Sequence, residues 1–381
     1  MIYIDNNATT PLDPGVIKKM SWFIENHFGN PSSLYPIGRE VKEMIQEARE
    51  SIAGAIGAKR SEIVFTGSGT ESDNFALRGV MDALPDKNHV ITSSVEHPAV
   101  IETADYLKRK GYQVTILPVD ETGLIDLDSL RDAVTPKTAL ISVMHANNEI
   151  GTIQPLNEII KIARKNDVLV HTDAVQTFGK IPLDVKKLDV DLLSVSAHKI
   201  YGPKGVGALY IKKGTPILPL IYGGHQEGRI RAGTENTPGI IGFGEAARLA
   251  VSHLSKDKKR LESLAEKLKN GIEEKIQDIK FNGHETRRIK TTLNYSFPGL
   301  EAEALLLGLA TEGICVSTGS ACSEDSEEVS PVLEAIKLNQ EESQSSIRFS
   351  LGRFNTQEDV DALLDILPEM VRNFREMSET E

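Results

Sequence analysis

Between about residues 60 and 211, short runs of β-branched and apolar residues alternate with stretches of helical character. The runs are EIVFT (62–66), HVITSSV (89–95), YQVTILPV (112–119), TALISVMH (138–145), VLVHTDA (168–174), LLSVSAH (192–198) and GVGALYI (205–211). This alternation predicts an α/β fold. Several runs are continuously apolar, so we expect strands buried on both faces, as in a mostly parallel sheet covered by helices. Ligands of such sheets bind beyond the strand ends.

Amphipathic segments on either side of this region predict helices and a second domain. Apolar residues recur at steps of three or four at Ile37, Val41, Ile45, Ala48, Ile52 and Ile56, and again at Leu261, Leu264, Leu268 and Ile272. The first set predicts a helix that ends near Gly57, and the second a long helix that leads into another domain. The strand-like runs TTLNYSF, CVSTGS and SIRFSL, followed by a last helical stretch, predict a smaller C-terminal α/β domain that begins near residue 250.

The charge balance excludes several classes of partner. The chain of 381 residues carries 43 Lys and Arg against 55 Asp and Glu, and such an acidic surface repels nucleic acids and anionic membranes. No apolar run approaches the ~20 residues of a membrane helix, and the N-terminal pattern is unlike a signal peptide. We therefore expect a cytoplasmic protein. Its two cysteines lack the paired spacing of a zinc site, so no metal centre is expected.

Polar residues follow four successive runs of the predicted sheet. They are Glu96-His97, Asn147-Asn148-Glu149, Asp173 with Gln176, and Ser196-Ala197-His198-Lys199. Taken singly, each has a structural interpretation as a helix cap, a turn or a loop residue. Together they predict one polar crevice, in which the amine of Lys199 could form an imine with an aldehyde cofactor. A buried Asp173 carboxylate nearby could keep a pyridine nitrogen protonated.

Two glycine-containing segments are candidates for anion binding. Thr66–Ser72 follows a strand-like run and opens a helical stretch, and a helix N-terminus suits a phosphate; the alternative is simply a capped helix. A dinucleotide site is disfavoured, because the GxGxxG pattern would need glycine at Ser72 and no GxxxxGK[ST] phosphate loop occurs. Gly223–Thr234 is rich in glycine and holds two arginines, so it could bind an anion or form a basic surface turn.

Three further residues carry possible chemistry. Cys315 lies in the apolar run Gly-Ile-Cys-Val and is interpreted as an inert core thiol. Cys322 lies in Ser-Thr-Gly-Ser-Ala-Cys-Ser before an acidic stretch, which predicts an exposed thiol that acts as a nucleophile, or else a neutral surface cysteine. Arg348 stands among strand-like residues and could grip a carboxylate with two N–H groups or form a structural ion pair.

In their order along the chain, these motifs closely resemble those of the cysteine desulfurases. The resemblance rests on Asp5–Thr10, Thr70-Glu71-Ser72, Glu96-His97, Asn147–Gly151, Asp173–Gln176, Ser196–Gly205 and Gly319–Cys322, and it runs nearly end to end. The spacing from Lys199 to Cys322 is similar to that of the NifS/IscS-like group, in which the catalytic cysteine lies on a mobile loop.

The resemblance implies a fold-type I enzyme of the class V pyridoxal-phosphate-dependent family. Its large domain, residues 15–250, would hold a mostly parallel seven-stranded sheet, and residues 1–14 and 251–381 would form the small domain that carries the catalytic cysteine. It also implies a cytoplasmic homodimer that converts L-cysteine to L-alanine. The sulfur would remain on Cys322 as a persulfide for transfer to an iron–sulfur scaffold or another acceptor protein.

The same resemblance assigns roles to individual residues. Lys199 would hold pyridoxal 5'-phosphate, His97 would stack on its ring and move protons, and Asp173 would pair with the pyridine nitrogen. The residues implied for the ring oxygen are Asn148 and Gln176, and those implied for the phosphate are Gly69, Thr70, Ser196, His198 and Thr234, the last from the partner subunit. Arg348, helped by Asn148, would bind the substrate carboxylate.

Two other interpretations stay open at this point. Another enzyme of the same fold, a selenocysteine lyase or an aminotransferase, would not use Cys322 as its sulfur acceptor. A regulatory protein on a doubly wound sheet could bind a nucleotide at the polar strand ends, although the sequence lacks both glycine-rich nucleotide motifs.

Overall fold

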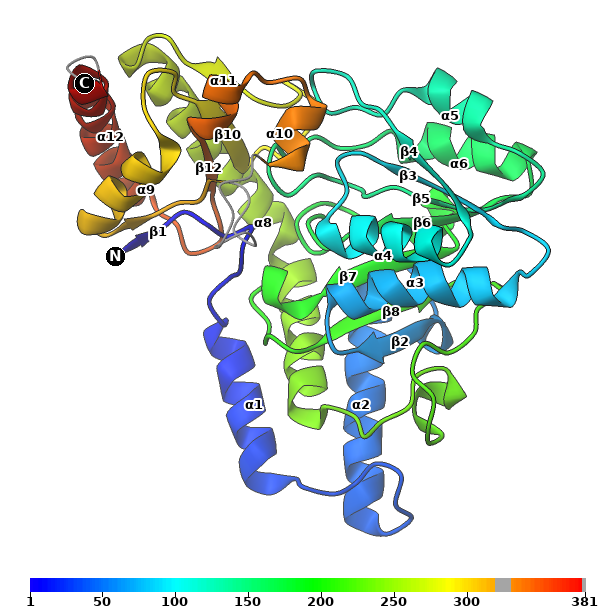
Figure 1. Cartoon of the computed structure of the whole chain (residues 1–381). Coiled ribbons are helices and arrows are strands. Elements are labelled where there is room, and N and C mark those ends of the chain that lie inside the picture. Colours follow the sequence, from blue (N-terminus) through cyan, green and yellow to red (C-terminus); the bar gives the residue numbers. More distant parts are fainter. Residues whose placement is uncertain (319–329, 379–381) are drawn as a thin grey trace.

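A seven-stranded sheet lies at the centre of the larger part of the molecule (Figure 1). The structure is a computed structural model that describes residues 1–318 and 330–378. The strand order is β2-β8-β7-β6-β5-β3-β4. The strands are β2 (Ile63–Thr66), β3 (His89–Ser93), β4 (Gln113–Leu117), β5 (Thr138–Ser142), β6 (Leu169–Asp173), β7 (Leu192–Ser196) and β8 (Gly207–Ile211). Neighbours from β4 to β7 pair in parallel, whereas β8 runs antiparallel to β2 and β7. The predicted mostly parallel sheet is confirmed.

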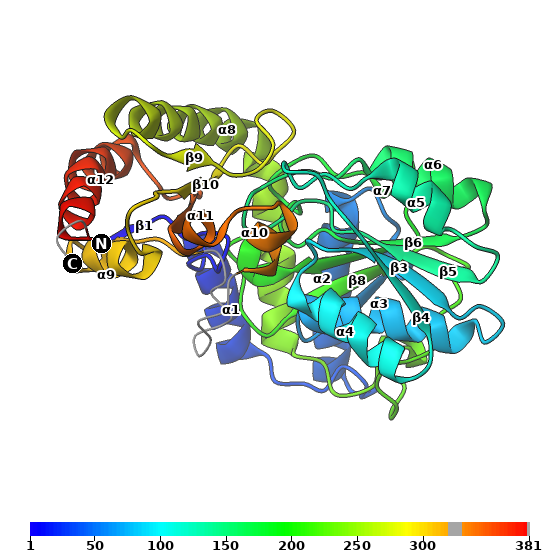
Figure 2. The same ribbon diagram turned by 45° about the horizontal axis from the view of Figure 1, so that its top comes forward.

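Helices cover both faces of this sheet (Figure 2). The helices in this part of the chain are α1 (Pro14–Asn26), α2 (Pro36–Ala55), α3 (Gly69–Ala83), α4 (Pro98–Arg109), α5 (Leu127–Ala133), α6 (Leu156–Lys165), α7 (Val185–Leu188) and α8 (Thr237–Lys275), with the short 3-10 helices η1 (Arg60–Glu62), η2 (Ala197–Lys199) and η3 (Gln226–Arg229). Because side chains alternate along a strand, Ile63 packs with α2 on one face while Val64 packs with α3 on the other.

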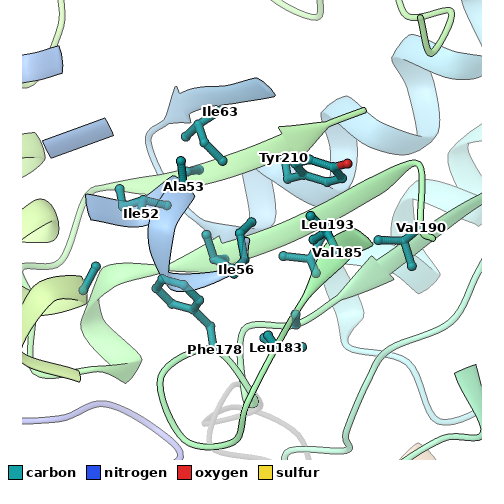
Figure 3. Packing of buried hydrophobic residues seen from close by; sticks show 14 of the residues in the cluster. Ile52, Ala53, Ile56, Ile63, Phe178, Leu183, Val185, Val190, Leu193 and Tyr210 are labelled. Carbon is teal, nitrogen blue, oxygen red and sulfur yellow. The ribbon is translucent and has the colours of Figure 1, made fainter. Parts of the chain in front are cut away.

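The core on the α2 face is built from the apolar stripe that the sequence predicts. Ile52 and Ile56 belong to the same cluster of buried side chains as Leu193 and Tyr210 of the sheet, which Figure 3 shows. Their side chains are almost fully buried, and burial of this kind is worth roughly 1.5–3 kcal/mol for each large apolar side chain. The helix ends at Ala55, close to the predicted position before Gly57.

The C-terminal part forms a second, smaller unit, with α9, α12, β9 and β10 on the left of Figure 2. It holds the strand pair β1 (Ile2–Tyr3) with β11 (Ile314–Cys315) and a sheet of order β12-β10-β9. Its remaining elements are β9 (Lys280–Phe281), β10 (Thr292–Ser296), β12 (Ser346–Ser350), α9 (Ala302–Thr311), α10 (Pro331–Ala335), α11 (Gln340–Gln344) and α12 (Gln357–Ser378).

Two hydrophobic cores lie on either side of the middle of α8. The core against the large sheet uses residues up to Ala250, and the other begins at Leu264 and includes Ile4 from the N-terminal segment. The helix itself continues without a break between them. We therefore propose two domains, residues 15–250 and residues 1–14 with 251–381. Among the helices in the described part of the chain, none is long and apolar enough to cross a membrane.

Candidate active site

The strands of the large sheet carry the predicted polar residues to one edge. Asp173 is the last residue of β6, and Lys199 ends the η2 turn that directly follows β7. His97 lies four residues beyond β3, and Asn148 follows β5. Because β3, β5, β6 and β7 are parallel neighbours, their carboxyl ends meet at this edge. The structure thus brings together side chains that are a hundred residues apart in sequence.

Asp173, His97 and Lys199 are close enough to influence one another's charge. Burial raises the pKa of Asp173, whereas His97 and Lys199 oppose that rise. Burial lowers the pKa of His97, with Lys199 acting in the same direction and Asp173 against it. Asp173 Oδ1 accepts the N–H of Val175 at 2.8 Å, and within the described residues no hydrogen bond reaches Oδ2. One carboxylate oxygen is therefore held by the backbone while the other can meet a ligand.

The position of His97 at the start of α4 determines the orientation of its side chain. It precedes Pro98, which forces an extended backbone on the residue before it, and His97 has φ −61° and ψ 146°. Its Nδ1 accepts the N–H of Ala99 at 3.1 Å, so the neutral ring carries its proton on Nε2. The preceding Glu96 binds the N–H of Met144 and thereby ties this turn to the chain after β5.

The candidate phosphate site lies where α3 begins. Gly69 starts this helix, and its N-cap Ser68 accepts the N–H of Glu71 at 3.1 Å. A Cβ on Gly69 would lie 2.9 Å from Val175 Cγ2 and 3.6 Å from Ser196 Cβ, so only glycine lets the helix start approach the ends of β6 and β7. Thr70 is exposed beside it. This close approach places Ser196 next to backbone N–H groups that suit a phosphate.

His198 and the glycine-rich loop have partners of their own. His198 Nδ1 lies 3.2 Å from Thr9 Oγ1, and burial lowers the pKa of this histidine to about 4, so it is neutral at physiological pH. Arg231 of the loop binds Glu71 with Nε at 2.8 Å and Nη2 at 3.1 Å. Its guanidinium is therefore engaged by a carboxylate. Thr234 of the same loop is exposed on this chain.

Asn7 joins several of the candidate residues to the N-terminal segment. Lys199 Nζ donates to the carbonyl oxygens of Asn7 at 2.5 Å and Ala8 at 2.6 Å. Gln176 Nε2 also donates to the Asn7 carbonyl, at 3.1 Å, and Lys180 Nζ donates to Asn7 Oδ1 at 3.1 Å. Asn7 lies in the motif Asp5–Thr10, for which the sequence indicated no role, and Lys180 was not among the predicted site residues. The spacing of Lys180 four residues after Gln176 is the signal that could have found it.

Arg348 is buried in β12 and faces the turn that follows β5. Its Nη2 pairs with Asp5 Oδ1 at 2.7 Å, and its Nη1 donates to the Asn148 carbonyl at 3.2 Å. The Asn7 Nδ2 group donates to the same carbonyl at 3.0 Å. Arg348 therefore lies beside Asn148, as a carboxylate site shared by the two residues requires. It also forms a structural ion pair, with Asp5, which was the alternative interpretation of this arginine.

Cys322 lies outside the described residues, but the residues on either side of 319–329 lie beside Arg348 and Asn148. The N–H of Ser317 donates to the Arg348 carbonyl at 3.3 Å, and the N–H of Arg348 donates back at 2.6 Å. Ser330 Oγ donates at 2.7 Å to buried Glu149, the residue after Asn148. The described residues Ser317 and Ser330 thus lie next to the candidate carboxylate site.

Comparisons with known proteins place this arrangement in a family. A model of the aminotransferase class-V family matches residues 2–363. Cysteine desulfurase IscS of Dictyoglomus turgidum is 52% identical to the chain, over 99% of this chain and 96% of that protein. The chain belongs to the cysteine desulfurases of the class-V family.

Solved structures agree with this assignment for the enzyme. A NifS-like protein superimposes with a TM-score of 0.92 at 41% identity and covers 98% of this chain and 99% of its own. SspA, solved in complex with cysteine, gives a TM-score of 0.83 at 36% identity over 93% of this chain and 100% of its own. The predicted fold-type I architecture is confirmed by these similarities.

Pyridoxal phosphate is the cofactor of this family, and the described residues fit it. A primary amine (Lys199), a buried carboxylate (Asp173) and a neutral histidine (His97) gather at one edge of the sheet. The close packing of Gly69 on the ends of β6 and β7 puts a helix N-terminus at the same edge. This donor set matches an aldehyde, a pyridine nitrogen and a phosphate, which are the three groups that the cofactor presents.

Proposed function

We propose that the enzyme converts L-cysteine to L-alanine and leaves the sulfur as a persulfide on Cys322. The observation that carries this proposal is the joint placement of Lys199, Asp173 and His97 at the strand ends, where Lys199 influences the pKa of both Asp173 and His97. Pyridoxal phosphate, when bound, supplies the electron sink that stabilises negative charge at the substrate α-carbon.

Each site residue then has a definite task. Lys199 would hold the cofactor, and its free amine would take the α-proton of cysteine. Asp173 would keep a proton on the pyridine nitrogen, because its buried carboxylate gains from a cationic partner. Arg348 and Asn148 would orient the substrate carboxylate, and His97 would contact the ring and transfer protons through Nε2.

The cofactor contacts complete the proposal. Asn148 and Gln176 would contact the ring oxygen. The residues proposed for the phosphate are Gly69, Thr70, Ser196, His198 and, from a second copy of the chain, Thr234.

Sulfur transfer moves one sulfur atom from the substrate to the thiol of Cys322. The thiolate of Cys322 attacks the substrate sulfur, an S–S bond forms, and the C–S bond to the substrate β-carbon breaks. The β-carbon is reduced and protonated to the methyl group of alanine, while sulfur is oxidised to the persulfide level. An iron–sulfur scaffold or another acceptor protein then takes this sulfur. We place the enzyme in the cytoplasm, where thiols stay reduced.

The proposal predicts one alanine for each cysteine consumed. The purified protein should be yellow, and with L-cysteine and a thiol reductant it should release alanine and sulfide in equal amounts. A selenocysteine lyase would instead turn over selenocysteine and leave cysteine unchanged, and an aminotransferase would require a keto acid. A colourless protein that added pyridoxal phosphate leaves unchanged would contradict the proposal.

We also propose that two copies of the chain form a dimer. Phe28, Leu34 and Tyr222 are large apolar side chains with exposed fractions of 88%, 81% and 75%, which is unusual for a surface in contact with water. Tyr222 directly precedes the glycine-rich loop that carries Thr234, the residue implied in the partner's phosphate site. A second copy is therefore the occupant that accounts for both features.

Light scattering should give a particle of twice the 41.7 kDa chain mass. Phe28→Asp combined with Leu34→Asp should yield monomers, because a charge in a buried apolar interface is costly. Leu307→Asp, at another exposed apolar position on α9, is the matched control and should remain dimeric. Monomeric wild-type protein at micromolar concentration would rule out the dimer.

A further inference from the structure

Lys180 is a second lysine at the candidate active site, and it shares a partner with Lys199. Its Nζ donates to Asn7 Oδ1 at 3.1 Å and to Gln176 Oε1 at 2.9 Å. Lys199 Nζ donates to the backbone carbonyl of the same Asn7 at 2.5 Å. Two ammonium groups thus bind two oxygens of one residue, so their charges lie close together.

The chain reaches this position through a specific turn. Gly179 has φ +71°, a conformation that residues with side chains rarely adopt. A Cβ there would lie 2.9 Å from Ile200 Cγ2 and 2.9 Å from Ala250 Cβ. Because Ile200 directly follows Lys199, this packing holds the turn of Lys180 against the backbone that carries the cofactor lysine.

Lys180 also orients two amide side chains. A lysine ammonium can only donate, so the oxygens of Asn7 and Gln176 must face it. Their amide nitrogens then point the other way: Gln176 Nε2 donates to the Asn7 carbonyl, and Asn7 Nδ2 donates to the Asn148 carbonyl and to Thr292 Oγ1. One buried ammonium therefore fixes the orientation of both amides.

We propose that Lys180 is a positioning residue for this desulfurase, which holds the side chains of Asn7 and Gln176 in place beside the amine of Lys199. The proposal rests on the proposed role of Lys199 as the cofactor lysine. Lys180 can hold both amides in this orientation while it is an ammonium, because an ammonium donates to both of their oxygens.

The groups around Lys180 set the pH range in which it is charged. Burial, followed by Lys199 and Arg348, lowers the pKa of Lys180 to about 7. His198 also faces it but is neutral at this pH, because burial lowers its pKa to about 4. Lys180 is therefore charged below about pH 7 and loses its proton above that pH. Its hold on the oxygens of Asn7 and Gln176 should therefore be strongest in the acidic range and weaken as the pH rises.

Competitive acetylation of the full chain, followed by peptide mass spectrometry, tests the proposal before cofactor is added. In the wild type, Lys180 should react with an apparent pKa of about 7, far below the ~10.4 of an ordinary lysine. Lys180→Met should change the acetylation rate of the Lys199 amine, because Asn7 is then no longer held, and Lys180→Arg, which can still donate to both amides, should change it much less. The control is Lys187→Met, which alters an exposed lysine of α7.

The holoenzyme gives a second, independent readout. The pH titration of its visible absorbance should shift in Lys180→Met and stay in place in Lys187→Met. The proposal is overturned if Lys180 reacts like an ordinary surface lysine in the wild type, or if Lys180→Met and Lys187→Met give the same titrations. Failure of borohydride to fix the cofactor on Lys199 would instead refute the proposed function, since acetylation of the cofactor-free chain does not depend on it.

Discussion

Replacement of Lys199 by alanine is expected to remove the covalent attachment of the cofactor and to lower alanine formation by on the order of 10³-fold or more. The reason is that, in the proposed function, one amine serves both as the attachment point and as the base at the α-carbon. Borohydride treatment followed by peptide mass spectrometry should find the reduced cofactor on Lys199 in the wild type. In the variant, the same treatment should leave every lysine unmodified.

The loss should be specific to this lysine. Lys187→Ala, at an exposed lysine of α7, should keep full activity and covalent cofactor. Retention of a borohydride-stable adduct in Lys199→Ala would show that another lysine, with Lys180 as the nearest candidate at Asn7, holds the cofactor. The substitution removes the Lys199 side chain beyond Cβ but leaves Gly179 and Ile200 in place, so the packing between these two residues should be kept in the variant.

Replacement of Cys322 by alanine is expected to stop sulfide release from L-cysteine, with a loss of about 10³-fold or more, and to leave the cofactor bound. The substrate sulfur then has no thiolate to receive it. The spectrum of the holoenzyme should still change when cysteine is added, because Lys199, Asp173 and Arg348 are intact. Mass spectrometry should detect a gain of one sulfur atom on Cys322 in the wild type and none in the variant.

Cys315→Ser provides the matched control, since Cys315 lies in β11 next to the N-terminal strand. This variant should desulfurate cysteine at the wild-type rate. Undiminished sulfide release by Cys322→Ala would refute the role of Cys322. Selenocysteine turnover that persists in Cys322→Ala while cysteine turnover is lost would favour the lyase as the alternative activity.

The sequence predicted the large sheet and its polar edge well, for a physical reason. Parallel strands buried on both faces appear as continuous apolar runs, and the residue that ends such a run lies at a ligand-binding edge. Asp173 and Lys199 could therefore be assigned to one crevice without any knowledge of their contacts. The structure confirms the strands and places these two residues together.

The contacts made by the N-terminal segment could not be predicted in this way. Asn7 binds Lys180, which lies 173 residues away, and Thr292, which lies 285 residues away. No local pattern encodes such pairs. Lys180 was overlooked because a lysine after a glycine normally indicates an exposed turn, and only tertiary packing buries it. The sequence indicated that Arg348 could form a structural ion pair, but it did not identify Asp5 as the partner.

The pairing of the first strand with one of the last bears on how the enzyme is made. Ile2 and Tyr3 pair with Ile314 and Cys315, and the N–H of Asn7 binds Ser350 Oγ. A ribosome adds residues in order, so the large sheet, complete at residue 211, can fold while these partners have yet to be synthesised. The carbonyls that receive Lys199 can be fixed in place only when translation is nearly finished. A nascent chain therefore has the strand ends that bind the cofactor well before it has a working desulfurase.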